Sequence, residues 1–210
     1  MYDHVLRHPK RIVLQPLARK LRVSPNLLTV LGLLPGLSSA LACLFGFFQM
    51  ALWLWILNRI MDGLDGEVAR AHGKQSDLGG YLDILADLLV YASLPLALSF
   101  YWNSLFIWGA CSLMIASFYL NVGSWMYLSS ILEKRGMGAD ESDESTTVCM
   151  PKGLIEGAET IVFFTLFLLL PQHVGYLFAV FGLLTLVGAL LRVRWAYHTL
   201  SSQSLTAQNG

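Results

Sequence analysis

Residues 62–70 read D-G-L-D-G-E-V-A-R, and residues 79–87 read G-G-Y-L-D-I-L-A-D. These two segments carry four aspartates at helical spacing, in a chain that is 55% hydrophobic and only 13% charged. A charged side chain at the centre of a membrane helix costs about 2.5–3.5 kcal/mol by insertion scales, so such residues mark functional sites. The first candidates for the chemistry of this protein are therefore Asp62, Asp65, Asp83 and Asp87.

The composition places the chain in a membrane. Soluble domains are roughly 25% charged, whereas this chain is 13% charged with a mean hydropathy of +0.57. Apolar runs of the roughly 20 residues that a transmembrane helix needs recur along the chain. We predict an all-α integral membrane protein with a single domain over residues 1–200 and a disordered tail at 201–210. The six predicted transmembrane helices lie near residues 27–48, 50–70, 79–101, 104–129, 153–170 and 174–195.

The positive charges predict the topology. An even number of helices puts both termini on one side, and all 14 Lys and Arg residues then fall on that side or toward that end of a helix. Because Lys and Arg are enriched in cytoplasmic segments, we expect both termini and the aspartates on the cytoplasmic side of a bacterial inner membrane. Residues 1–22 interleave six basic residues with apolar ones, which predicts an N-terminal amphipathic helix on the membrane surface.

Short connections are expected after three of the predicted helices. They are Gln49, the turn at Trp102-Asn103, and Pro171-Gln172-His173. The other connections are longer and charged. The loop at 71–78 joins the second and third helices, which carry the aspartates, and these two helices would form an antiparallel hairpin.

Each pair of aspartates shares one helical face, since Asp62 and Asp65 are three residues apart and Asp83 and Asp87 are four apart. The hairpin would bring the four carboxylates together. Oxygen-only ligands at a membrane surface suit Mg²⁺ or Mn²⁺, and two such ions could clamp a pyrophosphate. Arg70 adds a cation suited to phosphate. A cation transporter would also explain the acidic residues, but it would explain neither Arg70 nor the regular spacing of glycine and alanine between them.

The complete pattern is D-x2-D-G-x2-A-R-x8-G-x3-D-x3-D, and the chain resembles the CDP-alcohol phosphotransferase family at every position of it. That family consists of integral membrane enzymes that make phospholipids. Ser24-Pro25-Asn26 with Thr29 is similar to the P-N-x-x-T of the family, and Ser76 stands where a small polar residue is usual. Six transmembrane helices are also the number typical of the family.

The resemblance implies a role for each matching residue. Asp62, Asp65 and Asp83 would hold two divalent cations, Mg²⁺ or Mn²⁺, with a contribution from Asp87. Asp87 would also be the catalytic general base that takes the proton of the acceptor hydroxyl. The residues implied in binding the CDP group are Asn26, Gly66, Ala69, Arg70, Ser76 and Gly79.

The activity implied by the resemblance is transfer of a phosphatidyl group from CDP-diacylglycerol to the hydroxyl of a small polar alcohol, with release of CMP. A related alternative transfers a phospho-alcohol from a CDP-alcohol to diacylglycerol. The expected partners are the two substrates and membrane lipid, with a homodimer as the candidate assembly and no nucleic acid.

The acceptor alcohol stays open. Residues 82–98 are similar to bacterial phosphatidylserine synthases, including Pro95, whereas G-L-I-E-G at 153–157 resembles choline and ethanolamine phosphotransferases. Glu156 and Glu159 either meet the acceptor or favour the N-terminal dipole of a helix. Four basic residues could bind an acceptor phosphate or anchor at lipid headgroups: Arg135, Lys152, Arg192 and Arg194.

Overall fold

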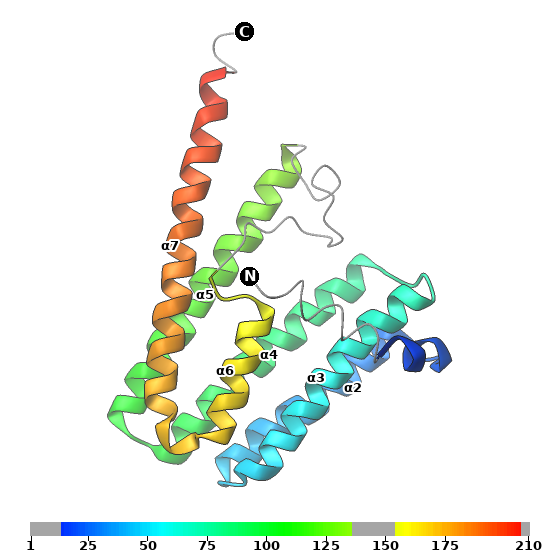
Figure 1. The fold of residues 1–210 in the computed structure, drawn as a ribbon, viewed down its shortest axis with the longest axis vertical. Helices are drawn as coiled ribbons and strands as arrows, with labels where there is room; N and C mark the ends of the chain where they lie inside the picture. The colour runs from blue at the N-terminus through cyan, green and yellow to red at the C-terminus, as the bar shows by residue number, and fades with distance from the viewer. Residues whose placement is uncertain (1–13, 136–153, 207–210) are drawn as a thin grey trace.

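The computed structural model describes residues 14–135 and 154–206, and every regular element within them is a helix (Figure 1). Residues 14–20 form a short first helical segment. The all-helical fold predicted from the sequence is thus confirmed. The elements that follow are α2 (Pro25–Leu44), α3 (Phe48–Ala71), α4 (Asp77–Trp102), α5 (Leu105–Lys134), α6 (Gly157–Leu169), the 3-10 helix η2 (Pro171–His173) and α7 (Val174–Thr206).

Four helices in the described part of the chain are long and apolar enough to cross a membrane, namely α2, α4, α5 and the helix formed by η2 with α7. The other two miss this criterion for different reasons. α3 carries the charged residues of the aspartate motif in its second half, and α6 has only 13 residues. The prediction of six transmembrane helices is therefore supported for four of them, and crossing by α3 and α6 stays a prediction.

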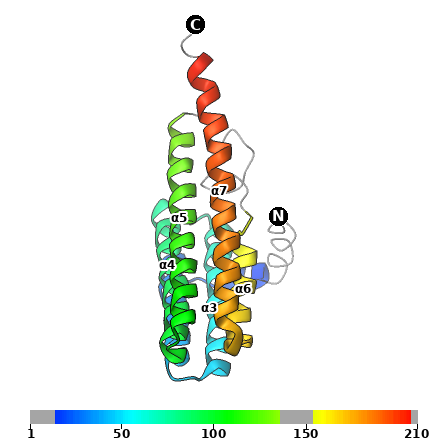
Figure 2. The same cartoon turned by 90° about the vertical axis from the view of Figure 1, so that its left-hand side faces the viewer.

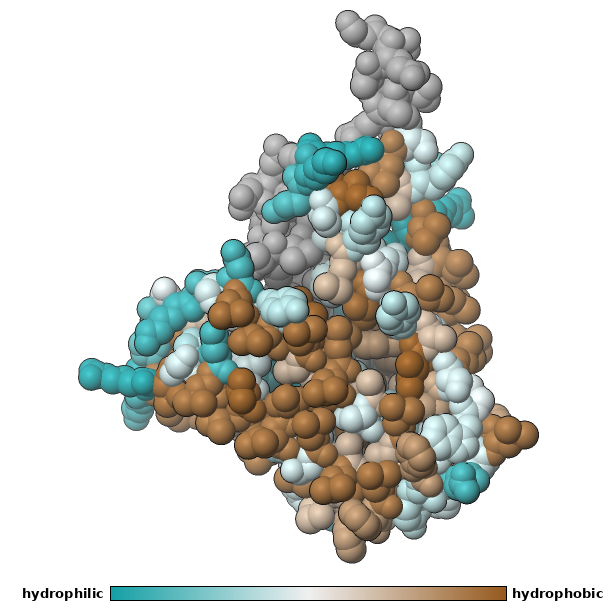
Figure 3. Space-filling model, turned by 180° about the vertical axis from the view of Figure 1, so that it is seen from behind, coloured by the Kyte–Doolittle hydropathy of each residue, from teal (hydrophilic) through white to brown (hydrophobic). Residues whose placement is uncertain are grey.

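Apolar side chains cover much of the outside of the bundle. Leu34, Trp53 and Val193 are each more than half exposed, at 60%, 62% and 58%. Figure 3 shows apolar side chains across the broad middle of one face, with hydrophilic ones gathered toward its upper and left edges. Soluble monomers rarely expose apolar patches of this extent, so this is a surface suited to lipid.

The helix ends follow signals in the local sequence. Pro25 stands in the first turn of α2, where a missing N–H leaves no hydrogen bond unmade. At the start of α4, the Ser76 hydroxyl accepts a hydrogen bond from the backbone N–H of Gly79 at 3.1 Å, as an N-cap residue should. Asn103 ends α4 in the left-handed conformation, with a φ of 41°, so the predicted turn at Trp102-Asn103 is confirmed.

The first connection differs from the predicted one. α3 begins at Phe48, so Gln49 lies inside the helix and the turn runs through residues 45–47. Gly46 has a φ of 77° in this turn, a conformation that glycine adopts without strain. The glycine, rather than the polar Gln49, therefore marks where the chain reverses.

The C-terminal helix is longer than predicted. α7 continues to Thr206, so residues 201–206 extend the helix instead of starting the disordered tail expected there. Residues 195–206 contain neither glycine nor proline, and nothing in them forces a helix to end. Residues 207–210 lie outside the described residues.

The N-terminal segment is described in part. The helical residues 14–20 lie across the ends of α2 and α3 (Figure 1). Ala18 is fully buried there in a small apolar cluster with Leu28, Leu64 and Val68. The rest of the predicted amphipathic helix, residues 1–13, lies outside the described residues, so a surface helix over 1–22 stays a prediction.

The long helices form two groups. α2 packs along α3 and α4, whereas α5 packs along α7, and α6 contacts both α3 and α7. The two groups lean apart toward the top of Figure 1, and Figure 2 shows α5 and α7 side by side. A Cβ atom at Gly36 of α2 would lie 2.6 Å from Val90 and 3.0 Å from Asn58. The glycine therefore allows α2 to approach α3 and α4 together, as small residues do in membrane helix packing.

An aromatic cluster joins the two groups of helices. Trp55 of α3 is fully buried and stacks on Phe164 of α6, with ring centroids 5.5 Å apart. Its indole N–H donates to Thr165 Oγ1 at 3.1 Å. Tyr91 of α4 meets Phe164 at 4.9 Å and Phe118 of α5 at 5.7 Å. This cluster supports the pocket described next from the side away from the α3–α4 loop.

Candidate active site

The structure places all four predicted aspartates at one pocket between α2, α3 and α4. Asp62 and Asp65 come from α3, and Asp83 and Asp87 come from α4. Because α3 leads into the loop at residues 72–76 and α4 leads out of it, their aspartates lie at the same end of the hairpin. The remaining residues that line the pocket are Thr29, Gly32, Leu33, Asn58, Arg59 and Ala86.

Neighbouring side chains hold these carboxylates in different ways. Asp65 is 5% exposed and accepts a hydrogen bond from Thr29 Oγ1 at 2.5 Å. Oδ1 of Asp87 accepts from Arg59 Nη2 at 2.8 Å. Oδ2 of Asp62 lies 3.7 Å from Arg59 Nη1. Thr29 of α2 and Arg59 of α3 therefore fix the orientation of part of the acidic cluster.

The ligand chemistry of the pocket fits a hard divalent cation. As the side chains stand, no three carboxylate, imidazole or thiolate groups in the described part of the chain converge closely enough to hold a metal ion. Yet the four aspartates on two adjacent helices supply only oxygen donors, as Mg²⁺ and Mn²⁺ prefer. One arginine offsets one of four like charges in surroundings of low dielectric constant. The donor set thus suits a hard divalent cation such as Mg²⁺ or Mn²⁺.

Arg59 is a charged residue of the pocket that the sequence analysis missed. It was counted only among the positive charges that set the topology, although it lies well inside an apolar span. In the structure it is 8% exposed and contacts two of the four aspartates. The signal that could have found it is its position one helical turn before Asp62, on the same face of α3.

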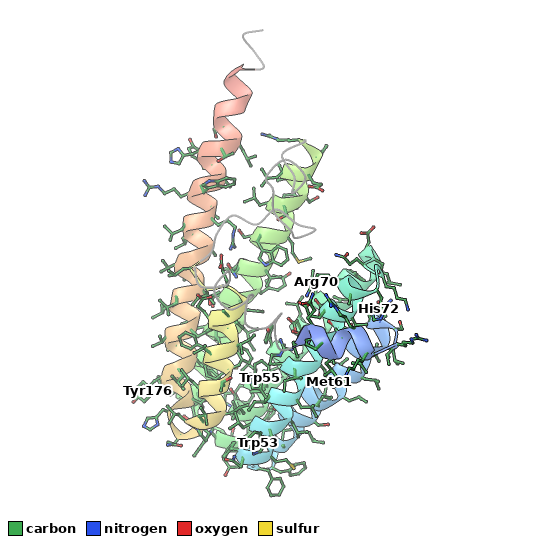
Figure 4. All side chains as sticks on the ribbon, turned by 45° about the vertical axis from the view of Figure 1, so that its right-hand side comes forward. Trp53, Trp55, Met61, Arg70, His72 and Tyr176 are labelled. Atoms are coloured by element: carbon green, nitrogen blue, oxygen red, sulfur yellow. The ribbon has the colours of Figure 1, made fainter. Side chains whose placement is uncertain are left out.

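The residues predicted to bind the CDP group form two sets. Arg70 is partly exposed at the end of α3, pairs with Glu67 Oε1 at 2.8 Å, and lies over Gly66, where a Cβ atom would be 3.3 Å from its Nη2. Figure 4 shows Arg70 and His72 at the same end of the helix, far from Trp53. Ala69 is half-buried on α3 beside them.

The second set lies at the starts of α2 and α4. A Cβ atom at Gly79 would be 3.1 Å from Asn26 Oδ1 and 3.2 Å from Ser76 Oγ. The structure therefore brings Asn26, Ser76 and Gly79 together, although Asn26 is about fifty residues away in sequence. Their role in binding a nucleotide stays a prediction.

Among the residues predicted to meet the acceptor, Glu156 and Glu159 lie at the start of α6, and Arg135 lies at the end of α5. Glu156 and Glu159 form a reciprocal capping box at the start of α6, and the Glu156 backbone N–H donates to Glu159 Oε2 at 3.1 Å. The capping box gives both glutamates a structural role at this helix end, and an acceptor role stays a prediction. Arg135 is exposed at the end of α5, and Lys152 lies outside the described residues.

Arg192 differs from a lipid-anchoring residue. It is only 6% exposed, and its Nη1 donates to both the backbone oxygen and Oδ1 of Asn121, at 3.1 and 2.8 Å. Headgroup anchoring is thus the wrong interpretation for this residue, because its side chain points between α5 and α7. Arg194, two residues later, is exposed, as an anchoring residue should be.

Sequence comparison relates the whole domain to known proteins. A sequence model of the CDP-alcohol phosphatidyltransferase family matches residues 22–193. The inner membrane protein YnjF of Escherichia coli K12 is 30% identical over 180 residues, which cover 86% of each chain. A bifunctional IPC transferase and DIPP synthase of Thermococcus kodakarensis is 44% identical over 72 residues, which are 34% of this chain and 16% of that protein.

Further matches concern a shorter region or the fold alone. The CDP-diacylglycerol–serine O-phosphatidyltransferase of Helicobacter pylori is 35% identical over 78 residues, 37% of this chain and 33% of that one. Among solved structures, phosphatidylinositol phosphate synthase (PgsA1) of Mycobacterium tuberculosis with CDP-DAG bound superposes with a TM-score of 0.67. It is 17% identical, and the match covers 87% of this chain and 92% of that chain.

Proposed function

This chain belongs to the CDP-alcohol phosphatidyltransferase family, and we propose that it transfers the phosphatidyl group of CDP-diacylglycerol to the hydroxyl of a small polar alcohol. The observation that carries the proposal is the meeting of the four aspartates of the signature at one pocket. The fold supports it, because the similar mycobacterial enzyme was solved with CDP-DAG bound. The membership itself makes the protein a membrane transferase of phospholipid synthesis.

The carboxylates of Asp62, Asp65 and Asp83 would hold two divalent cations, with a contribution from Asp87. When bound, Mg²⁺ or Mn²⁺ would neutralise the pyrophosphate of the donor and stabilise the charge that develops on it. Thr29 positions Asp65 for this role, since its hydroxyl takes one carboxylate oxygen and leaves the other. The pair of Asp83 and Asp87, one turn apart on α4, forms the opposite wall.

Asp87 is the group best placed to act as general base. The proton of the acceptor hydroxyl would pass to its carboxylate as the acceptor oxygen bonds to the lipid-linked phosphorus. The bond from that phosphorus to the bridging oxygen of CMP breaks at the same time, and CMP leaves with the electron pair. Asp87 lies one turn farther from the α3–α4 loop than Asp83, toward the side where the acyl chains of the donor would lie.

We expect the nucleotide nearer the loop. Arg70 would lend its guanidinium to the diphosphate, exchanging Glu67 for a more highly charged partner. The absence of a side chain at Gly66 and Gly79 leaves room for the ligand to approach the backbone. Asn26 and Ser76 offer polar groups beside Gly79 for the base or ribose. In this arrangement the active site faces the cytoplasm, where CDP-linked substrates are made.

The test of this proposal is product identification with purified protein. Labelled CDP-diacylglycerol is supplied with Mg²⁺ and, one at a time, serine, glycerol 3-phosphate, inositol phosphate, choline and phosphatidylglycerol. We expect CMP and one new phospholipid with a single acceptor. If the protein instead consumes a CDP-alcohol and diacylglycerol, transfer runs in the alternative direction. If CMP is released from neither donor class, the proposed enzyme function is wrong.

Arg70→Ala should weaken donor binding and leave the chemical step largely intact. A hydrogen bond to a charged group contributes about 1.5–3 kcal/mol, so we expect KM for CDP-diacylglycerol to rise about 10- to 100-fold with kcat nearly unchanged. Initial rates over a range of donor concentrations measure both constants. Lys74→Ala is the control, because it removes an exposed positive charge from the adjacent loop. A loss of kcat at unchanged KM would contradict the assignment.

The proposed topology predicts where introduced cysteines can be labelled. In a Cys149→Ser background, where Cys43 and Cys111 are buried, a cysteine at exposed Ser201 should react with a membrane-impermeant maleimide only from the cytoplasmic side. One at exposed Gln172 should react only from the opposite side. Intact and inverted vesicles make the comparison. Reversed labelling would overturn the positive-inside assignment. Labelling of both cysteines from one side would mean that the helix between them, η2 with α7, does not cross the membrane.

A further inference from the structure

Arg59 is a charged residue placed deep in the helix bundle. It lies 12 residues before the end of α3 at Ala71, about 18 Å along the axis at roughly 1.5 Å per residue. The hydrocarbon core of a bilayer is about 30 Å thick, so Arg59 lies near its middle if α3 crosses the membrane. Arginine at that depth is costly and persists where it has partners and a function.

Each guanidinium nitrogen of Arg59 has a hydrogen-bond partner. Nε and Nη2 donate to Asn58 Oδ1 at 2.9 and 2.7 Å. Nη1 donates to the Tyr91 hydroxyl at 2.8 Å, and Nη2 also donates to Asp87 Oδ1 at 2.8 Å. Asn58 is itself fixed, since its Nδ2 donates to the backbone oxygen of Gly32 at 2.9 Å. Residues of α2, α3 and α4 thus hold the guanidinium in one orientation.

Aromatic faces complete the surroundings of the guanidinium. Its central carbon lies 4.7 Å from the Trp55 ring centroid and 5.2 Å from the Tyr91 ring centroid, within the range of cation–π attraction. The same two rings belong to the aromatic cluster that contacts α5 and α6. Movement of Arg59 would therefore require repacking between the two groups of helices.

Stability alone does not account for this arrangement. A buried ion pair contributes little net stability, because desolvation cancels much of the attraction. An apolar side chain packed against Trp55 and Tyr91 would not carry this desolvation penalty. The arginine of the family signature is Arg70, so no motif assigns Arg59. What an apolar residue could not supply is the hydrogen bond to Asp87 and a permanent charge beside Asp62.

We propose that Arg59 is a positioning residue for the transfer reaction. Its hydrogen bond to Oδ1 fixes the orientation in which the Asp87 carboxylate meets the acceptor hydroxyl, and its charge limits how tightly the carboxylates bind divalent cations. The first half rests on the function proposed above. The second half depends only on the charges of the pocket, and it is measurable without turnover.

The two parts of the proposal, the orientation of Asp87 and the affinity for divalent cations, can be tested separately. An arginine supplies a planar set of donors for the first and a charge for the second. Lysine keeps the charge but not the planar set of donors. Without any cation at position 59, the acidic cluster attracts Mg²⁺ more strongly, while the Asp87 carboxylate is free to rotate away from its productive orientation. The unusual expectation is tighter metal binding together with slower turnover.

The experiment compares full-length wild type with Arg59→Met, Arg59→Lys and Tyr91→Phe in detergent. The first readout is kcat and KM for CDP-diacylglycerol at saturating acceptor. The second is the Mg²⁺ concentration that gives half of the thermal stabilisation in the absence of substrates. Ser39→Ala is the control, since it also removes a buried hydrogen bond between α2 and α3, from Ser39 Oγ to the Ala51 backbone oxygen at 2.8 Å, outside the pocket.

For Arg59→Met we expect kcat to fall by at least about tenfold from misplacement of Asp87, with donor KM nearly unchanged and the Mg²⁺ midpoint about tenfold lower. Arg59→Lys should return the midpoint to that of wild type and recover only part of kcat. Tyr91→Phe should lower kcat slightly without moving the midpoint, and Ser39→Ala should change neither. If Arg59→Met does not fold, the lysine variant still decides, through reduced kcat at an unchanged Mg²⁺ midpoint.

Wild-type kcat and Mg²⁺ midpoint in both Arg59 variants, whatever their melting temperatures, would overturn the proposal. The failure of the general function looks different. A wild type that releases no CMP from any donor, but whose Mg²⁺ midpoint shifts in Arg59→Met, would contradict the transfer reaction and leave the charge effect standing. If the wild type is active but kcat and the Mg²⁺ midpoint are unchanged in the Arg59 variants, the transfer reaction stands and the role proposed for Arg59 is wrong.

Discussion

Asp83→Asn should abolish transfer while the protein remains folded and inserted. The amide keeps the size of the side chain but replaces a charged ligand by a neutral one, and metal ions stabilise such transition states by several kcal/mol. We therefore expect CMP release to fall by at least about 10³-fold, and Asp62→Asn to behave in the same way. Removal of divalent cations with a chelator should have the same effect on wild type, and Mg²⁺ or Mn²⁺ should restore activity.

Asp77→Asn is the matched control for this series. It makes the same substitution on the same helix, but Asp77 is exposed in the first turn of α4 and does not line the pocket. Its activity should stay close to that of wild type. Full activity of wild type in excess chelator would contradict the metal-dependent mechanism, and full activity of Asp83→Asn would remove Asp83 from the set of ligands.

Asp87→Asn should lower kcat by at least about 10²-fold, the low end of general-base contributions, with little change in donor binding. The alcohol oxygen is a poor nucleophile until its proton is removed, and an amide cannot accept that proton. The fold should survive, because the amide oxygen can still accept the hydrogen bond that Arg59 now donates to Oδ1. Steady-state rates at varied donor and acceptor, together with donor binding measured directly, test this.

The pattern of loss identifies the role of Asp87. A fall in kcat alone supports the base, and it is the opposite of the pattern expected for Arg70→Ala. Near-normal kcat in Asp87→Asn would mean that the base lies elsewhere. A combined loss of donor and Mg²⁺ binding would mean that Asp87 is primarily a ligand of the metal.

Much of the fold and the pocket could be predicted because the relevant signals are local. Apolar length locates the helices, the Ser76 cap and the Asn103 turn lie within a few residues of the ends they set, and helical spacing puts each aspartate pair on one face. The loop predicted at 71–78 joins the two helices in an antiparallel hairpin, and the pairs meet. The roles of these residues as ligands, base and nucleotide contacts remain predictions.

The features that the sequence did not reveal depend on contacts between distant residues. Arg59 appears in the sequence as one more basic residue, and its contacts with Tyr91 and Asp87 become visible only when α4 packs beside α3. Burial of Arg192 depends on Asn121, which is 71 residues away. The helix predicted at 153–170 starts only at Gly157, since Glu156 caps it. That capping box is a local signal, although the sequence analysis considered only the helix dipole for these glutamates.

The shortness of α6 has a consequence for how a water-soluble substrate could arrive. Its 13 residues span about 20 Å, whereas the hydrocarbon layer is about 30 Å thick. Its lower end is level with those of α5 and α7 (Figure 1), so the shortfall lies at the upper end, where residues 154–156 are not helical. Backbone of that kind at membrane depth needs cover from protein or contact with water. Ile155 is 8% exposed and has such protein cover, whereas Leu154 is 46% exposed. If α6 crosses the membrane, water would reach the exposed part of this segment, and an alcohol from the cytoplasm could then approach α3 without crossing the whole hydrocarbon layer.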